Sequence, residues 1–225
     1  MESKTENYQS VATTYNSAMR FIKIVGAVSL VLAPLLSFIG WAIAHDSIGS
    51  FLNLNFTWTP TDATTKLTAS SEPSLLFRYF LLPHYFIYSS MPVYIGLAIA
   101  LMYKLHKKAP WHSFIGVILS IIGAVYFIGV LGAFLSIPMG SVNVTNILKI
   151  SFALCILVFV GNIVQGFALL KTNILAKWQS ILFIIGNILI LIFPGTENWM
   201  ALGSLIMLIA LFPLSMKILK QHTHN

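Results

Sequence analysis

The pattern of apolar and polar positions divides the chain into six long apolar runs separated by shorter polar segments. The second run begins near Pro83 and ends at Lys104, and the basic turn after it also holds Lys107 and Lys108. A helix needs about 20 residues to cross a hydrocarbon core of about 30 Å, so a span that ends at Lys104 begins near Pro83 and His84. The pattern therefore predicts a membrane-spanning helix with one basic end and with His84 at the opposite interface.

The other five runs have the length and apolar character of membrane-spanning helices as well. We expect an all-α, polytopic membrane protein whose six transmembrane helices form three hairpins. The predicted spans cover residues 24–44, 83–103, 111–134, 150–170, 178–193 and 200–216. Together they make a six-helix domain over residues 21–217, with an N-terminal tail at 1–20, a long polar loop at 45–74 and a C-terminal tail at 218–225.

Composition agrees with a membrane location. Hydrophobic residues make up 57% of the chain and charged residues only 8%, and the mean hydropathy is +0.86. Soluble domains are about a quarter charged, so a soluble protein is excluded. The net charge of +7 does not indicate a nucleic-acid partner, because the lysines cluster in short segments between apolar runs, as membrane topology requires. The expected partner is the lipid bilayer, with no nucleic acid.

The distribution of basic residues predicts the orientation of the chain. Loops on the cytoplasmic side of a membrane carry an excess of Lys and Arg. The predicted inner segments hold ten basic residues: Lys4, Arg20, Lys23, Lys104, Lys107, Lys108, Lys171, Lys177, Lys217 and Lys220. The predicted outer segments hold three: Lys66, Arg78 and Lys149. We therefore predict a multi-pass protein of the plasma membrane with both termini in the cytoplasm.

This orientation also sorts the ionisable side chains by depth. A first span of about 20 residues places His45 and Asp46 at the outer interface, at the level of His84. Arg78 and Glu197 fall in or near the same layer. No carboxylate is expected at mid-membrane, which argues against a pump or ion-coupled carrier built on buried acids.

These outer residues suggest a pocket beneath the loop at 45–74. Its candidate ligand-binding residues combine aromatic walls with polar groups: Trp41, His45, Arg78, His84, Tyr85 and Tyr88. A histidine beside a carboxylate can act as a general acid or base near neutral pH, so His84 with Asp46 or Glu197 is the candidate catalytic set. The competing interpretation is that these residues only end helices at the headgroup level, where charged and aromatic side chains are common.

Three carboxamides lie within the predicted spans, at Asn162, Gln165 and Asn187. Such groups are costly in an apolar helix unless they find hydrogen-bond partners, and Asn162 and Gln165, three residues apart, share one helix face. We favour a structural role as interhelical hydrogen bonds, each worth about 0.6 kcal/mol, over ligand binding. The glycines of the third span are also expected to permit close helix packing: Gly116, Gly123, Gly129 and Gly132.

No motif selects one activity. The chain lacks the H-E-x-x-H, paired C-x-x-C, G-x-S-x-G and glycine-rich phosphate-loop patterns. The residues His45, Asp46, His84 and Glu197 have no metal-site spacing, so neither a metal nor a cofactor is predicted. The prediction that we favour is binding or transport of a small apolar or lipid-like molecule through the outer-facing pocket. Two alternatives stay open: an intramembrane enzyme acting on a lipid or isoprenoid, and a non-catalytic regulatory or immunity subunit with a membrane-protein partner.

Overall fold

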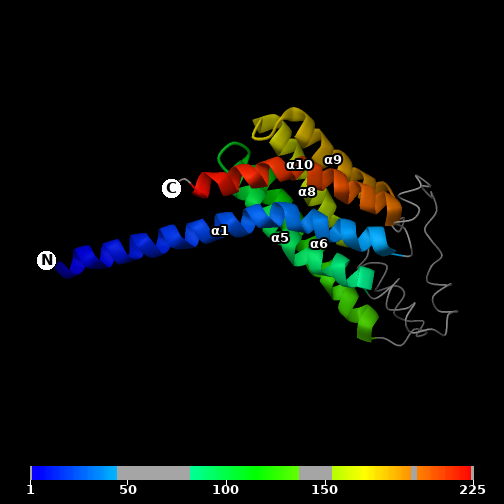
Figure 1. Cartoon of the computed structure of the whole chain (residues 1–225), viewed down its shortest axis with the longest axis horizontal. Coiled ribbons are helices and arrows are strands. Elements are labelled where there is room, and N and C mark those ends of the chain that lie inside the picture. Colours follow the sequence, from blue (N-terminus) through cyan, green and yellow to red (C-terminus); the bar gives the residue numbers. More distant parts are fainter. Residues whose placement is uncertain (1, 45–81, 137–153, 194–196, 224–225) are drawn as a thin grey trace.

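The computed structural model describes residues 2–44, 82–136, 154–193 and 197–223, which are helical apart from short turns (Figure 1). The six helices are α1 (Glu2–Ile43), α5 (Leu82–Leu105), α6 (Pro110–Ser136), α8 (Leu157–Thr172), α9 (Lys177–Ile192) and α10 (Glu197–Thr223). Helices α1, α5, α6 and α10 each contain a stretch long and apolar enough to cross a membrane, whereas α8 and α9 are apolar but have only 16 residues each. The predicted all-helical fold is thus confirmed for the described residues, four of these helices are long and apolar enough to span a membrane, and six crossings stay a prediction.

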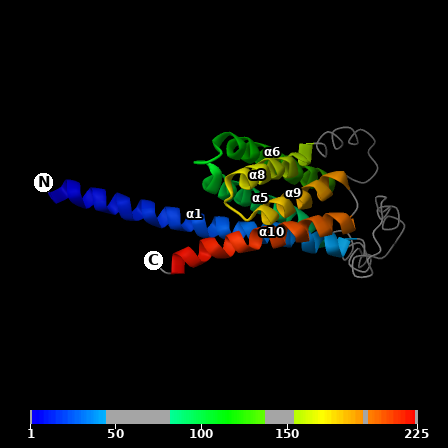
Figure 2. The ribbon, with the colours of Figure 1, turned by 90° about the horizontal axis from the view of Figure 1, so that it is seen from above.

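Helix α1 is much longer than the predicted first span. It begins at Glu2, whereas its apolar stretch begins at Met19 and runs to Ile43. Figures 1 and 2 both show its N-terminal part projecting beyond the other helices. Most of the segment that the sequence assigned to a tail therefore continues the first helix.

The six helices form a closed ring. Each helix contacts the next one along the chain, α10 returns to contact α1, and α5 also contacts α8 across the ring. Figure 2 shows α1 and α10 side by side along one face of the bundle, with α8 and α6 on the other. Large side chains that are fully buried, such as Tyr94 of α5, Phe183 of α9 and Met207 of α10, fill the interior.

Small residues set the distance between neighbouring helices in this ring. A Cβ atom added at Gly161 of α8 would lie 2.5 Å from the carbonyl oxygen of Gly116 of α6 and 2.7 Å from the backbone nitrogen of Ser120. Gly186 of α9 and Gly203 of α10 approach in the same way, because a Cβ on either would lie 2.6 Å from the other's carbonyl oxygen. Membrane helices gain association energy from such close packing, since lipid supplies no hydrophobic drive between them.

The glycines of α6 divide into two groups. Gly116 and Gly123 lie at close approaches to α8, which confirms the packing role that was predicted for them. A Cβ added at Gly129 would meet no atom within 4 Å. Close packing is therefore observed at Gly116 and Gly123 and not at Gly129, while the surroundings of Gly132 lie outside the described part of α6.

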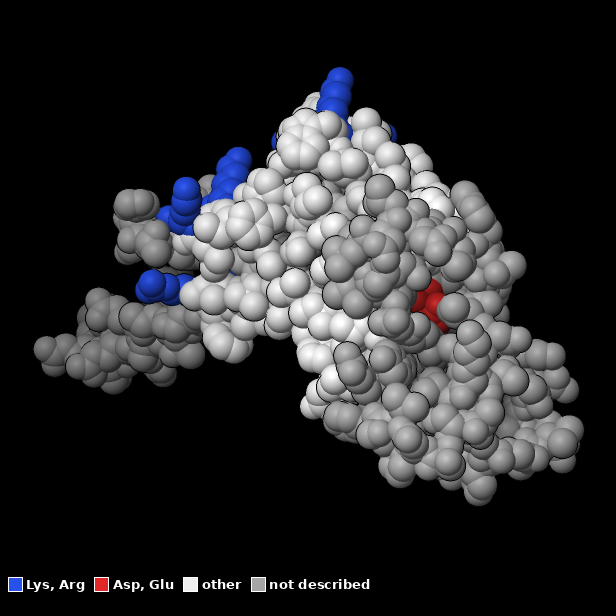
Figure 3. Space-filling view, turned by 45° about the vertical axis from the view of Figure 1, so that its right-hand side comes forward, with Lys and Arg blue, Asp and Glu red and all other residues white. Residues whose placement is uncertain are grey.

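Basic side chains gather at one end of the bundle. The turn after α5 carries Lys107 and Lys108, the last turn of α8 carries Lys171, and α9 begins at Lys177. Figure 3 shows the blue lysine and arginine atoms on this side and the red acidic atoms away from them. We call this the lysine end, and the end where α5 and α10 begin the opposite end.

The contact between α6 and α8 gives the first prediction. Gly161→Ala places a methyl group against backbone atoms, which cannot move aside as a side chain can, so we expect a loss of about 1–3 kcal/mol of folding free energy. Gly129→Ala on α6 is the control. Because a Cβ at this position meets no atom within 4 Å, it should cause no loss of folding free energy. Thermal unfolding of the detergent-solubilised protein measures both variants, and equal stability of the two would contradict the described α6–α8 packing.

Candidate functional site

The predicted outer residues that the structure describes all lie at the opposite end of the bundle. Trp41 is near the end of α1, His84 and Tyr85 are in the first turn of α5, and Glu197 is the first residue of α10. Gly40 of α1 lies close to the start of α5, since a Cβ added there would be 2.9 Å from the carbonyl oxygen of Pro83. The fold therefore brings these helix ends to one level, as the orientation argument predicted.

The aromatic candidates differ in their surroundings. Tyr88 is buried, and its ring lies 5.8 Å from the His84 ring and 5.3 Å, edge-on, from the Phe127 ring of α6. Trp41 is half-buried and packs against the core. Tyr85 is 71% exposed and faces away from the bundle. The structure thus joins His84 to Tyr88 and separates Tyr85 from them.

The acid–base set that was predicted for this end is only partly described. His45, Asp46 and Arg78 lie outside the described residues, so a contact of His84 with Asp46 stays a prediction. Glu197 is buried at the start of α10. Within the described parts of the chain, no group of three or more His, Cys, Asp or Glu side chains could hold a metal ion.

The carboxamides make the interhelical hydrogen bonds that the sequence predicted. Asn162 Nδ2 of α8 donates to Asn187 Oδ1 of α9 at 3.1 Å, and Asn187 Nδ2 donates to the carbonyl oxygen of Phe183 at 2.7 Å. Gln165 Nε2 donates across the ring to the carbonyl oxygen of Ala98 of α5 at 2.9 Å. No donor among the described residues reaches Asn162 Oδ1 or Gln165 Oε1. These amides fix α8 against both α9 and α5.

Two buried serines of α10, which the sequence analysis missed, attach this helix to α1. The hydroxyl groups of Ser204 and Ser37 are hydrogen-bonded at 3.0 Å, and the Ser215 hydroxyl donates to the carbonyl oxygen of Ala27 at 2.6 Å. A serine in an apolar run gives little sequence signal, because its hydroxyl can also bond within its own helix. These two bonds set the position of α10 along α1.

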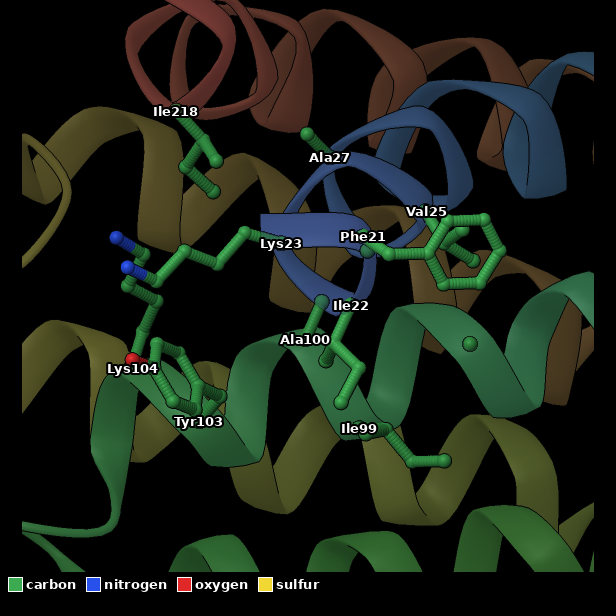
Figure 4. A pocket seen from close by; sticks show the side chains of 12 residues that line it. Phe21, Ile22, Lys23, Val25, Ala27, Ile99, Ala100, Tyr103, Lys104 and Ile218 are labelled. Atoms are coloured by element: carbon green, nitrogen blue, oxygen red, sulfur yellow. The ribbon is translucent and has the colours of Figure 1, made fainter. Parts of the chain in front are cut away.

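A concave site among the described residues lies at the lysine end, where the sequence predicted none. It is a groove of about 220 Å³ between α1 and α5, closed on one side by Ile218 of α10 (Figure 4). Its floor consists of small residues: Gly26, Ala27, Gly96 and Ala100. Its walls are larger and mostly apolar: Phe21, Ile22, Val25, Ile99 and Tyr103. Lys23 and Lys104 complete the lining.

The groove exists because small residues hold α1 and α5 close together. A Cβ added at Gly26 would lie 2.9 Å from Ala100 Cβ, and one added at Gly96 would lie 2.5 Å from Ser29 Oγ. The residues at this crossing have side chains too short to fill the space between the two helices. The longer side chains of Val25 and Ile99 stand beside the contact and are exposed, so the groove opens outward.

The charge at the groove is entirely positive. Figure 4 shows the Lys23 and Lys104 side chains extending toward the same side of the groove. The positive charges of Lys23 and of Lys217 of α10 both act on the Lys104 ammonium group. Lys23 and Lys104 are half-buried, whereas Lys107, Lys171 and other lysines of the turns are exposed. The aliphatic stems of Lys23 and Lys104 therefore cover apolar surface, while their charged ends reach outward.

Comparison with known proteins supplies no relative for this site. No protein-family model matches the chain, and no curated protein or solved structure matches it. The function must therefore be inferred from the chemistry of the described residues alone.

The amide bond between α8 and α9 can be tested by a double-mutant cycle. For Asn162→Leu and Asn187→Leu we expect a coupling free energy of about 0.6 kcal/mol, the usual value for a hydrogen bond between membrane helices. As a control, Asn162→Leu should combine additively with Ser215→Ala, because Ser215 bonds to α1 and shares no partner with Asn162. Unfolding in detergent measures each variant, and additive effects in the first pair would contradict the described bond.

Proposed function

We propose that this chain is an integral membrane protein that holds a small apolar or lipid-like molecule in the groove between α1 and α5. The shape and apolar lining of the groove support this proposal. Its small-residue floor and apolar walls lie within the apolar stretches of two membrane-type helices. The walls include Phe21, Val25 and Ile99, which are all exposed on the molecular surface. In a bilayer such a surface is covered by acyl chains, so a groove open to it takes up an apolar chain.

The volume of the groove indicates how much of a molecule it holds. Pockets for drug-sized ligands have volumes of about 300–1,000 Å³, and this groove has about 220 Å³. It therefore accommodates a segment of an acyl or isoprenoid chain and leaves the rest of the molecule outside. Lys23 and Lys104 stand where the chain would leave the groove.

We propose further that the lysine end faces the cytoplasm and that all six helices cross the membrane. The excess of basic residues at this end supports the orientation. The hydrogen bonds that join α8 to α9 and α5 support placing the two shorter helices in the membrane, because an amide that faces lipid without a partner would be costly. The groove then opens to the cytoplasmic leaflet.

The predicted outer pocket has weaker support. Only part of it is described, and among its described candidates the rings of His84 and Tyr88 lie 5.8 Å apart. The intramembrane enzyme and the regulatory or immunity subunit stay predictions, since no described contact favours either one.

Filling the groove tests the proposal. Ile99→Trp enlarges an exposed wall residue without touching the contact of Gly26 with Ala100, so the fold should persist while the groove closes. Loss of burial for about two methylene groups should reduce retained lipid about tenfold. Native mass spectrometry of the detergent-extracted protein measures the fraction that carries one lipid.

Ile118→Trp is the matched control, because Ile118 is equally exposed on α6 and lies outside the groove. It should retain lipid as the unsubstituted protein does. If both tryptophan variants keep the same bound lipid, or if both lose it equally, the groove is not the binding site and the proposed function is wrong.

A further inference from the structure

We infer that the molecule held in the groove is an anionic membrane lipid whose phosphate is bound by Lys23 and Lys104, with Lys217 completing the positive field. The inference rests on the proposed function and specifies the headgroup of the ligand. It assigns a recognition role to lysines that topology alone would explain as ordinary inner-side charges.

The first support is the convergence of charge from three helices. Lys23, Lys104 and Lys217 belong to α1, α5 and α10, which are brought together by the ring, and Lys104 is repelled by both of the others. The chain has six acidic residues, Glu2, Glu6, Asp46, Asp62, Glu72 and Glu197. Among the described residues that line the groove none is acidic, so no lining side chain neutralises the two ammonium groups.

The second support is the order of groups along the groove. Lys23 precedes Gly26 by three residues on α1, and Lys104 follows Ala100 by four residues on α5. Both lysines are therefore about one helical turn, or about 5.4 Å, nearer the lysine end than the small-residue floor. A phospholipid has the same order, with an anionic phosphate directly beyond its apolar chains.

The third support is a contrast within the same end of the bundle. Four lysines of this end are exposed and line no part of the groove: Lys107 and Lys108 in the turn after α5, Lys171 at the end of α8 and Lys177 at the start of α9. Lys23 and Lys104 are half-buried beside it, with Tyr103 adjacent (Figure 4). Basic pockets between transmembrane helices on the cytoplasmic side are a recognised form of anionic-headgroup site, and only the second group has that form.

The test compares two lipids that differ only in the headgroup, one anionic and one zwitterionic. The full-length protein is extracted in detergent and incubated with equal amounts of phosphatidylglycerol and phosphatidylcholine that carry identical acyl chains, and native mass spectrometry measures which lipid it retains. We expect a preference for phosphatidylglycerol. Each lysine near an anionic surface contributes about fivefold, so Lys23→Gln/Lys104→Gln should reduce this preference about 25-fold.

Lys171→Gln/Lys177→Gln is the charge-matched control and should keep the preference. Glutamine retains a polar side chain without the charge, and equal melting temperatures of the two double variants verify that both are folded. The inference is overturned if Lys23→Gln/Lys104→Gln keeps the preference, or if the two double variants lose it equally, since the effect would then follow net charge.

Failure of this inference differs from failure of the proposed function. Suppose that the unsubstituted protein retains both lipids equally and that Ile99→Trp removes both. The groove then binds acyl chains but does not discriminate between headgroup charges, and this result overturns the inference alone. If retention of phosphatidylglycerol is insensitive to Ile99→Trp, the groove is not the site and both conclusions fall.

Discussion

The close approach of α1 to α5 is the contact on which the rest of the structure depends. Gly26 meets Ala100 and Gly96 meets Ser29 without space for a further methyl group. This contact joins two helices that are separated in the chain by residues 44–81, and α1 in turn holds α10, which closes the ring. The absence of large side chains at the crossing also leaves the groove. One packing solution therefore supplies both the stability of the bundle and its candidate binding surface.

Hydrogen bonds fix how far the helices slide along one another. Close packing of small residues is non-directional, whereas the bonds from Asn162 to Asn187 and from Ser215 to the carbonyl of Ala27 each permit one register. In lipid no water replaces a lost partner, so such bonds favour a single arrangement. The Ser215 bond matters for the groove because it sets the level of α10, and thereby places Ile218 in the lining of the groove together with Lys104.

The apolar runs and lysine positions predicted the helices, their order and the lysine end, because hydrophobic length and charge are local properties of the sequence. The carboxamides were correctly expected to bond between helices, although their partners could not be named. The groove was missed because it depends on which faces of α1 and α5 meet, and Gly26 and Ala100 carry no sign of each other in the sequence. For the outer pocket, the sequence named His84 and Tyr88, which do meet, whereas His45, Asp46 and Arg78 lie outside the described residues.

The most direct test of the account locates a lipid on the protein within a bilayer. The chain is reconstituted with phosphatidylglycerol that carries a photoreactive diazirine in the acyl chain, and the crosslinked peptides are identified by mass spectrometry. The account predicts that labelling is concentrated on the groove walls, at Phe21 to Val25 of α1 and at Ile99 to Tyr103 of α5. Uniform labelling of all the exposed apolar faces, including Ile118 of α6 and Ile209 of α10, would show that the groove holds no particular lipid and would contradict it.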